Sequence, residues 1–323
     1  MTSTALPLLS QIVRHDAFER ASAEIDLRLA TRLPGTGSII PVFGPTRVGK
    51  SEIMRRLEKR AAPANSLPPM KNVIRAKLPP QTNGRDIYVA ILNKLGRRPR
   101  QNEVTTSVKA RVFQGLESLN IDVVVLDEGN HIAERGSNLS PRAAADHLKA
   151  IVDETGVTLI LDGLPRFQRI IDQNEQLRDR ASGTILLKPY DWQVSDDREA
   201  FATAADAAIV SLEGSGFPVG LEFEDFVRRL YGASGGRVPM MMRIIKLCAL
   251  GIGKPREIGL SDLHRAASSM QQSCIPAASF FETRDPDEVD LMRSFAAIMS
   301  EAGLEFGVDT LAGLGIEWGA QAG

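Results

Sequence analysis

The chain has 323 residues, which is enough for one large or two modest domains with a buried core. Hydrophobic residues make up 43% and charged residues 24%, the composition of an ordinary soluble globular protein. With a net charge of −1, the overall charge predicts neither a nucleic-acid-binding nor a membrane-binding protein.

The first two thirds of the chain alternate strand and helix patterns. Residues 1–34 are predicted to form one or two helices ahead of the core. Strands are then expected at 38–43, 73–78, 121–127, 157–163 and 183–190, and helices at 51–60, 85–96, 104–119, 141–154 and 166–180. This alternation predicts an α/β domain with a doubly wound parallel sheet over residues 35–190.

From residue 191 onward only helical patterns are strong. They are expected at 197–212, 222–231, 237–250, 261–272 and 286–302. We therefore predict a small helical lid domain over residues 191–275. The remainder, 276–323, is interpreted as an acidic C-terminal tail with a partner-binding role as one option, because nine acidic and two basic residues follow position 281.

Cysteine usage and hydropathy exclude other classes. Cys248 and Cys274 lie far apart and form no CxxC pair and no ligand cluster with the four histidines. A disulfide scaffold and a zinc site are therefore not expected, and a reducing cytoplasm fits. The N-terminal stretch lacks the pattern of a signal peptide, and no run of about 18 uncharged apolar residues occurs. We expect a cytoplasmic protein without membrane contact.

The stretch 44-GPTRVGKS-51 matches the P-loop pattern GxxxxGK[ST], with a strand before it and a helix starting within it. Its glycines let backbone N–H groups face phosphate oxygens, and the helix start adds a positive dipole end. Lys50 is predicted to reach the β- and γ-phosphates, and the Ser51 hydroxyl to bind Mg²⁺. The predicted nucleotide contacts in this loop are Gly44, Pro45, Thr46, Arg47, Val48, Gly49, Lys50 and Ser51.

Acidic side chains follow two of the predicted strands. Asp127 ends the apolar run 121-IDVVVLD-127, where ligands gather in parallel sheets, and is expected to hold Mg²⁺ with Ser51. Glu128, next to it, is the predicted catalytic base that orients and deprotonates the attacking water. The alternative is a solvated acidic pair. Asp162, after the following strand, is predicted either to sense the γ-phosphate or to cap the next helix.

Three arginines are further candidates. Arg178 and Arg180 precede the last core strand, from which one of them could reach the nucleotide of a neighbouring subunit and stabilise transferred charge. The alternative is that they complement a helix dipole. Arg237 stands at the start of a predicted helix, an electrostatically poor position that hints at a nucleotide contact. The alternative there is a surface arginine.

The order GPTRVGKS, VVVLDEGNHI, QLRDRAS and GGRVPMMMRIIKLC resembles AAA+ ATPases, and more narrowly the TniB/TnsC group of transposition ATPases, relatives of the phage Mu B protein. The helices ahead of the P-loop strand and His131 behind the acidic pair are similar too. The resemblance covers residues 10–270. It implies ATP and Mg²⁺ as cofactors. It also implies assembly on double-stranded DNA as a ring or helical filament, and recruitment of a DDE transposase with a TniQ-like adaptor as a loading partner.

A basic block gives this resemblance partial support. Between positions 71 and 111 ten Lys or Arg stand against two acidic residues. Such side chains would contact DNA phosphates without sequence preference and in a salt-sensitive way. The alternative is a solvated loop with excess charge. The candidate DNA-binding residues are Lys94, Arg97, Arg98, Arg100 and Lys109.

Two positions depart from the family pattern. Arg47 stands where the family usually has a small residue such as glycine, and Leu164 where it often has Thr or Asn. The second departure puts the γ-phosphate sensor in doubt. Another class also fits the motifs, namely a signalling or defence NTPase whose nucleotide-driven oligomerisation acts on protein partners. A third is an initiator-like clamp or helicase loader, against which the lack of a C-terminal winged-helix pattern counts.

Overall fold

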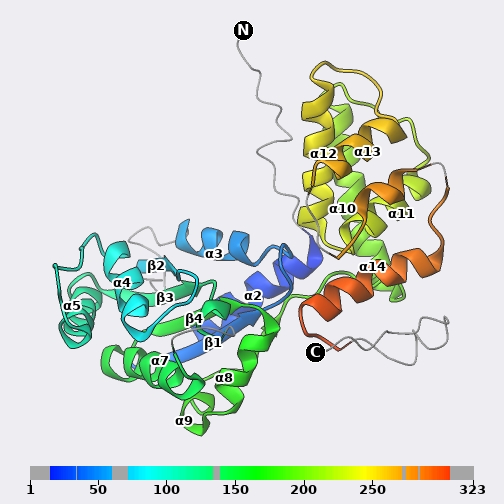
Figure 1. The fold of residues 1–323 in the computed structure, drawn as a ribbon. Coiled ribbons are helices and arrows are strands. Elements are labelled where there is room, and N and C mark those ends of the chain that lie inside the picture. The colour runs from blue at the N-terminus through cyan, green and yellow to red at the C-terminus, as the bar shows by residue number, and fades with distance from the viewer. Residues whose placement is uncertain are drawn as a thin grey trace. The chain divides into compact units, whose positions relative to one another are not determined.

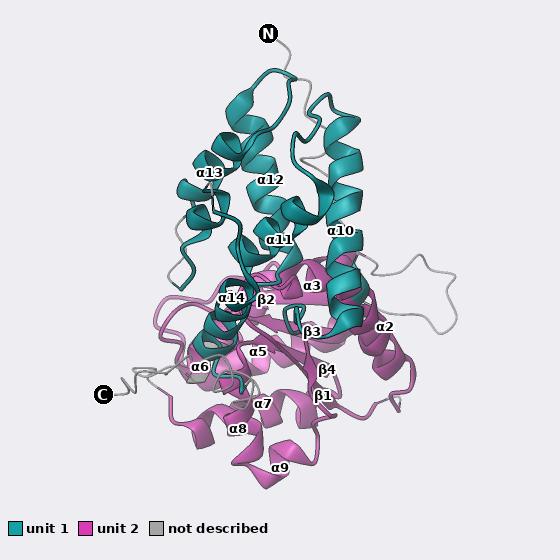
Figure 2. Cartoon of the chain, turned by 90° about the vertical axis from the view of Figure 1, so that its right-hand side faces the viewer, with its two compact units in different colours: residues 1–16, 188–323 teal, residues 17–187 magenta. Residues whose placement is uncertain are grey.

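The computed structural model describes residues 15–33, 35–59, 72–133, 139–270, 274–282 and 284–305. Residues 1–14 of the predicted N-terminal extension and residues 306–323 of the predicted tail lie outside this set. The chain divides into two compact units (Figure 2). We call Ala17–Leu187 the α/β unit, and Lys188–Gly323 together with Met1–Asp16 the helical unit.

The α/β unit contains a five-stranded sheet in the order β2-β3-β4-β1-β5, with every pair parallel. The strands are β1 (Ser38–Phe43), β2 (Asn72–Lys77), β3 (Ile121–Asp127), β4 (Thr158–Gly163) and β5 (Ile185–Leu186). All five predicted strands are present, but β5 is much shorter than the expected 183–190. Leu187 donates one more bond, to Phe43 O at 2.8 Å, and Pro189, which has no N–H, cannot continue the ladder.

Helices cover both faces of this sheet (Figure 1). They are α2 (Asp16–Ala30), α3 (Lys50–Lys59), α4 (Gly84–Lys94), α5 (Thr105–Ser118), α6 (Asn130–Ala133) and α7 (Pro141–Thr155). Strand side chains alternate between two buried clusters: Val125 and Ile160 pack with α2 and α3, whereas Leu126 and Leu161 pack with α4, α5 and α7. The fold is therefore doubly wound, as predicted.

The predicted helix over 166–180 is wrong as a single element. The chain forms three short pieces there: η1 (Pro165–Phe167), α8 (Gln168–Asp172) and α9 (Glu175–Arg178). The break falls at Asn174, whose side chain accepts a hydrogen bond from the Leu177 N–H at 3.0 Å and so starts α9 afresh. Asparagine competes with the helical backbone in this way, and apolar spacing alone does not reveal it.

The helical unit contains α10 (Ser195–Glu213), α11 (Phe223–Ser234), α12 (Val238–Ile252), α13 (Leu260–Ser268), η2 (Ala277–Phe281) and α14 (Glu288–Glu301). Apart from an isolated bridge between Val219 and Ile258, its described residues form no β-structure. The run Met240–Met242 is buried. In the part of the chain that the structure describes, no helix combines the length and the apolar character needed to cross a membrane.

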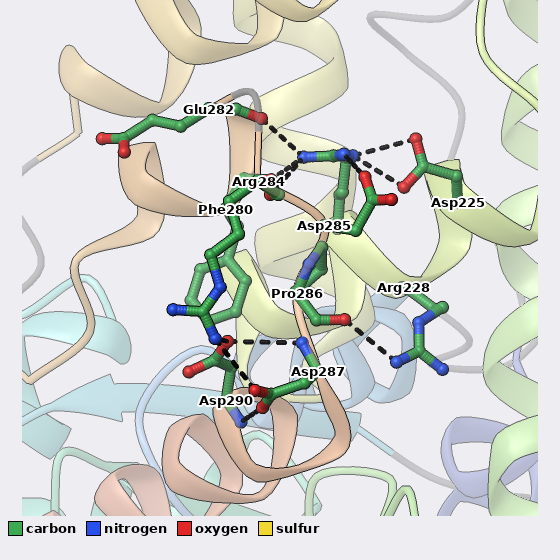
Figure 3. Close-up of polar contacts among 10 residues, drawn as sticks. Asp225, Arg228, Phe280, Glu282, Arg284, Asp285, Pro286, Asp287 and Asp290 are labelled. Atoms are coloured by element: carbon green, nitrogen blue, oxygen red, sulfur yellow. Dashed lines mark hydrogen bonds and ion pairs between the residues drawn. The ribbon is translucent and has the colours of Figure 1, made fainter.

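A buried arginine organises one end of this unit. Arg229 in α11, 2% exposed, donates from Nε to both carboxylate oxygens of Asp225 at 2.8 and 2.9 Å. Its Nη1 donates to the backbone carbonyls of Phe280, Glu282 and Arg284, and its Nη2 pairs with Asp285. Figure 3 shows these acceptors around one guanidinium. The acidic segment before α14 is thus tied to α11.

Candidate nucleotide-binding site

The P-loop joins the end of β1 to the first turn of α3, as its sequence pattern predicts. A side chain at Gly44 would place its Cβ 2.2 Å from the Leu187 carbonyl oxygen, so only glycine fits. Gly49 has φ +110°, a conformation that other residues rarely adopt. The carbonyl of Gly49 then accepts hydrogen bonds from Glu52 and Ile53, which begins the helix. Both glycines are needed for the path of the loop.

Arg47 takes up the left-handed conformation, with φ +61°. This explains why glycine suits the position, since a side chain there costs about 1–2 kcal/mol. Thr46 and Arg47 are exposed at the outer side of the loop, whereas Pro45 and Val48 are buried beneath it. The departure from the family pattern is therefore a strained residue on the exposed side of the P-loop.

Lys50 is the first residue of α3 and its ammonium lies within the loop. Nζ donates to the carbonyls of Gly44 and Pro45, both at 2.8 Å. Burial lowers the pKa of Lys50, and the nearby carboxylates of Asp162, Glu128 and Asp127 oppose that shift. Ser51 follows on the exposed side of the same turn.

Three polar residues continue the strand alternation onto the α3 face of the sheet. Asp127 follows Leu126, and Asp162 follows Leu161, with which Leu126 is paired in register. Both acids thus fall on the same face as Val125 and Ile160, the face that packs against α3. Arg75, at the position paired with Val125, shares that face. Parallel strand ends meet at one edge, so these side chains converge beside Lys50.

Asp127 is buried, and three hydrogen bonds hold its carboxylate. Its Oδ2 accepts hydrogen bonds from Nε of Arg75 at 3.0 Å and from Nη2 of the same residue, and its Oδ1 accepts the N–H of Glu128 at 3.0 Å. Sequence reasoning did not single out Arg75. The available signal was a lone arginine within a strand of otherwise apolar pattern, at a position whose side chain falls on the same face of the sheet as the acidic residues.

Glu128 has a strained backbone. Its φ is +61°, which is uncommon for a residue with a long side chain and frequent at functional sites. The following residue, Gly129, donates its N–H to the Asp162 carbonyl at 2.7 Å, which holds this turn against β4. The Glu128 carboxylate is 42% exposed and lies 3.7 Å from Nζ of Lys77. It is therefore open to solvent at the edge where Asp127 is buried.

Asp162 is buried inside β4, and among the described residues its Oδ1 has no hydrogen-bond partner. Burial raises its pKa well above the usual range, and the neighbouring Asp127 adds to the rise. The alternative that Asp162 caps the next helix does not fit, because Leu164 occupies the N-cap position of η1. A buried polar atom without a partner points to an incomplete site.

The donor set fits Mg²⁺ bound together with a nucleotide. Among the described residues, no group of three or more His, Cys, Asp or Glu side chains is placed to hold a metal ion. Mg²⁺ in phosphate-binding sites takes one or two protein oxygens and completes its shell with phosphates and water. The Ser51 hydroxyl and the Asp127 carboxylate are oxygens of this kind, and they would hold the ion only with bound phosphate.

The predicted arginines occupy different environments. Arg180 is half-buried and forms a two-point ion pair with Asp153 of α7 in its own chain. Arg178, the last residue of α9, is exposed, and its Nη1 donates to the Asp172 carbonyl at 3.4 Å. Arg237, the N-cap residue of α12, is buried rather than on the surface, and its Nε donates to Ser234 O at 2.8 Å.

The candidate DNA-binding residues are also unequal. Lys94, Arg98 and Arg100 are exposed at the end of α4 and in the loop after it. Arg97 is half-buried and lies against α5, with Nη2 3.4 Å from the Ser118 hydroxyl. Lys109, on α5, has its ammonium 2.6 Å from a Glu154 carboxylate oxygen. The structure thus leaves three of the five basic side chains open on one short stretch.

This sheet order, with a P-loop after β1 and acidic residues at the ends of β3 and β4, defines the α/β fold of the AAA+ ATPases. The sequence matches the family of the bacterial TniB protein over residues 11–189, more than half of the chain, and the protein belongs to that family. Among curated proteins, none matches the sequence.

Solved structures share the fold at low sequence identity. The ORC2 protein of Aeropyrum pernix, described with ADPNP and ADP, matches with a TM-score of 0.55 and 17% identity over 78% of this chain and 68% of its own. Cdc6p of Pyrobaculum aerophilum matches with a TM-score of 0.55 and 15% identity, over 98% of this chain and 89% of its own. A Walker-type ATPase of Pyrococcus abyssi matches with a TM-score of 0.50 and 15% identity, over 79% of this chain and 71% of its own.

Proposed function

We propose that the protein is an ATP-dependent regulator of DNA transposition. In this proposal it assembles on double-stranded DNA as a ring or helical filament, selects target sites, and recruits or activates a DDE transposase. The observation that carries the ATPase part is the convergence of Lys50, Asp127 and Asp162 on one face of the sheet beside a P-loop. Membership in the TniB family supports the transposition part.

Each residue at the sheet edge has a role in this proposal. The loop N–H groups bind phosphate oxygens, and Lys50 exchanges its two carbonyl acceptors for the β- and γ-phosphates. Ser51 and Asp127 hold Mg²⁺, which neutralises phosphate charge. Glu128, exposed beside Asp127, orients and deprotonates the attacking water. Asp162 senses the γ-phosphate: its raised pKa favours a protonated carboxyl that can donate a hydrogen bond.

The two arginines before β5 are not equivalent candidates for a contact across subunits. Arg180 already has a two-point partner in Asp153, which it would have to leave at an energetic cost. Arg178 is exposed and gives up only a long hydrogen bond to one carbonyl. We therefore assign the trans role to Arg178, and a nucleotide contact from the helical unit to Arg237.

One experiment tests the proposal as a whole. The protein is incubated with duplex DNA and ATP, a slowly hydrolysed ATP analogue, or ADP, and then imaged by electron microscopy. Rings or filaments that need both DNA and a triphosphate are expected. Oligomers that form with ATP but ignore DNA would contradict it. A Glu128→Gln variant should trap the DNA-bound assemblies, and assemblies that dissociate as fast as wild type would remove Glu128 from the role of base.

The basic stretch after α4 is tested by salt dependence. Replacing Arg97, Arg98 and Arg100 by alanine should weaken binding to all duplex sequences. It should also reduce the slope of log K against log salt concentration by about 2–3, because each phosphate contact contributes about 0.9. Lys109→Ala is the matched control, since its ammonium is paired with Glu154 and should affect the slope less. An unchanged slope in the triple variant would place the DNA site elsewhere.

One observation favours a second candidate function. The basic block that predicts DNA binding is partly neutralised within the chain, since Lys109 pairs with Glu154 and Arg111 with Glu103. A signalling or defence NTPase, whose partners are proteins, would need no open basic surface. ATP-dependent oligomers that bind no DNA at any salt concentration would favour this second candidate.

A further inference from the structure

Arg75 is the residue at the sheet edge to which the proposed function gives no role. Its guanidinium donates twice to Oδ2 of Asp127, from Nε at 3.0 Å and from Nη2. The Asp127 side chain is 8% exposed, so water reaches it little. Arg75 therefore holds the carboxylate to which the proposed function assigns Mg²⁺, and the inference below depends on that function.

The hydrogen bonds of Asp127 leave little room for a metal ion. A carboxylate offers about four lone-pair positions. Arg75 occupies both on Oδ2, and the Glu128 N–H occupies one on Oδ1. A hard divalent cation would find at most one position open, since the Asp162 side chain also lies within hydrogen-bonding reach of Asp127, and a guanidinium charge is bonded to the other oxygen of the same carboxylate. Two cations on one buried carboxylate repel strongly, because the surroundings screen them less than water does.

The guanidinium also has a route away from the carboxylate. Arg75 lies in β2, which is the edge strand of the sheet among the described residues, so none of the other four strands covers its outer side. Its side chain is 20% exposed, in contrast to that of Asp127. Lys77, two residues along the same strand, is 69% exposed and lies beside the Glu128 carboxylate. In the described part of the chain, the outer rim of β2 thus carries side chains that reach solvent at the level of the site.

We propose that Arg75 competes with Mg²⁺ for Asp127, so that the ion binds only when the guanidinium leaves the carboxylate. Arg75 is a positioning residue in this role. Without metal it keeps a buried carboxylate paired, and with metal it swings toward solvent. The strength of this ion pair then sets how much Mg²⁺ the site requires, and it delays occupation of the site until both nucleotide and metal are present.

Arg75→Gln tests the proposal in the full chain saturated with a slowly hydrolysed ATP analogue. Mn²⁺ serves as the probe, and binding is followed from the electron paramagnetic resonance signal of the free ion, corrected for nucleotide alone. We expect a dissociation constant for Mn²⁺ about tenfold lower than that of wild type. A decrease of less than threefold, or an increase, would overturn the competition.

Arg32→Gln is the matched control. Arg32 pairs with Asp122 at 3.0 Å, at the opposite end of β3, and the two side chains are 23% and 21% exposed. Its loss removes an Arg–Asp pair from the same strand without touching the site, so Mn²⁺ affinity should stay within twofold of wild type. If Arg75→Gln does not fold, Arg75→Lys replaces it. Lysine keeps the charge but loses the two-point fork, so an affinity increase of at least threefold is still expected, and an unchanged affinity overturns the proposal.

The same measurement separates this inference from the proposed function. Asp127→Asn should weaken Mn²⁺ binding by more than tenfold, because it removes the carboxylate charge. If wild type binds no Mn²⁺ with the analogue, or if Asp127→Asn binds it unchanged, the proposed metal site is wrong. If Asp127→Asn behaves as expected and Arg75→Gln does not tighten binding, only the competition is wrong.

Discussion

Two clusters of arginine and aspartate in this molecule resemble each other in composition and differ in how completely their hydrogen bonds are satisfied. In the helical unit every nitrogen of the Arg229 guanidinium has an acceptor, supplied by Asp225, Asp285 and three backbone carbonyls (Figure 3). At the sheet edge of the α/β unit, Arg75 and Lys50 face Asp127 and Asp162, and one Asp162 oxygen has no partner among the described residues.

Backbone strain follows the same division. Arg47 and Glu128, both with φ +61°, belong to the sheet edge. Among the described residues of α11, η2 and α14, which surround Arg229, no residue other than glycine has a positive φ. A cluster with all bonds made stabilises a fold, whereas an incomplete and strained one is typical of a site that awaits a ligand. Substitutions should therefore cost stability at the Arg229 cluster and ligand binding at the sheet edge.

Arg229→Met should cost about 3 kcal/mol of the free energy of unfolding, because it leaves three backbone carbonyls, among them the buried one of Phe280, without their donor. Urea unfolding, followed by circular dichroism, measures the change. Arg284→Ala, in the same segment, is the control: its side chain is 74% exposed and pairs with Asp287 and Asp290, so less than about 1 kcal/mol is expected. Equal costs for the two variants would remove the structural role of Arg229.

Lys50→Ala should abolish nucleotide binding while leaving the fold stable. An affinity loss of at least about 100-fold is expected, since a charged contact to phosphate is lost, which corresponds to about 2.7 kcal/mol. A fluorescent ATP analogue measures the affinity, and thermal unfolding checks the fold. Lys59→Ala, at the exposed end of the same helix, should bind as wild type. A variant that loses stability instead of affinity would make the sheet edge structural, like the Arg229 cluster.

Asp162→Asn should stabilise the protein at neutral pH. Burial raises the pKa of Asp162 in the folded protein well above its ordinary value of 3.8. The protonated carboxyl therefore contributes its full stability to the fold only below pH 3.8, and this stability is lost as the pH rises through the folded-state pKa. Asparagine removes this loss. Thermal melts at pH 5 and pH 8 should show a gain for the variant that is larger at pH 8, by about 1 kcal/mol or ~2–4 °C. A gain independent of pH would rule out titration of Asp162 as its source.

Arg47→Gly and Arg47→Ala together isolate the strain in the P-loop. Both variants lose the guanidinium, but only alanine keeps a Cβ at φ +61°. The glycine variant should be the more stable of the two by about 0.5–1 kcal/mol, since the left-handed penalty exceeds the extra entropy of an unfolded glycine. Chemical denaturation of the two variants gives the difference directly. If alanine is as stable as glycine, the loop relaxes and holds no strain.

The sequence predicts the fold more completely than it predicts the candidate site. The strand runs 38–43 and 121–127 are observed at the predicted residues, because long apolar stretches bounded by breakers leave little choice. The helix predicted over 166–180 was wrong, since the side-chain cap at Asn174 outweighs a continuous apolar pattern. The short length of β5 depends on where Pro189 interrupts its pairing with β1, and that pairing is set by tertiary structure.

For the candidate site, the sequence predicts the P-loop and the acidic residues at the strand ends, but it does not point to Arg75. A glycine-rich loop followed by a buried strand that ends in Asp-Glu occurs in few structural contexts, so the order of residues alone predicts phosphate-binding chemistry there. An arginine inside a strand occurs in many. Its meaning came from the register of β2 on β3, which pairs Arg75 with Val125 and lets it reach Asp127 52 positions away.

Local spacing in the sequence predicted the fold class, and it predicts a P-loop and acidic residues at strand ends, because parallel sheets bring strand ends together. Which charged side chains are paired within the chain follows from the tertiary structure. It paired Arg180 with Asp153 and Lys109 with Glu154, enclosed Arg229 completely, and left an Asp162 oxygen without a partner in the described chain. Charge neutralisation acts over a few ångströms between segments distant in sequence, and no local pattern encodes those distances.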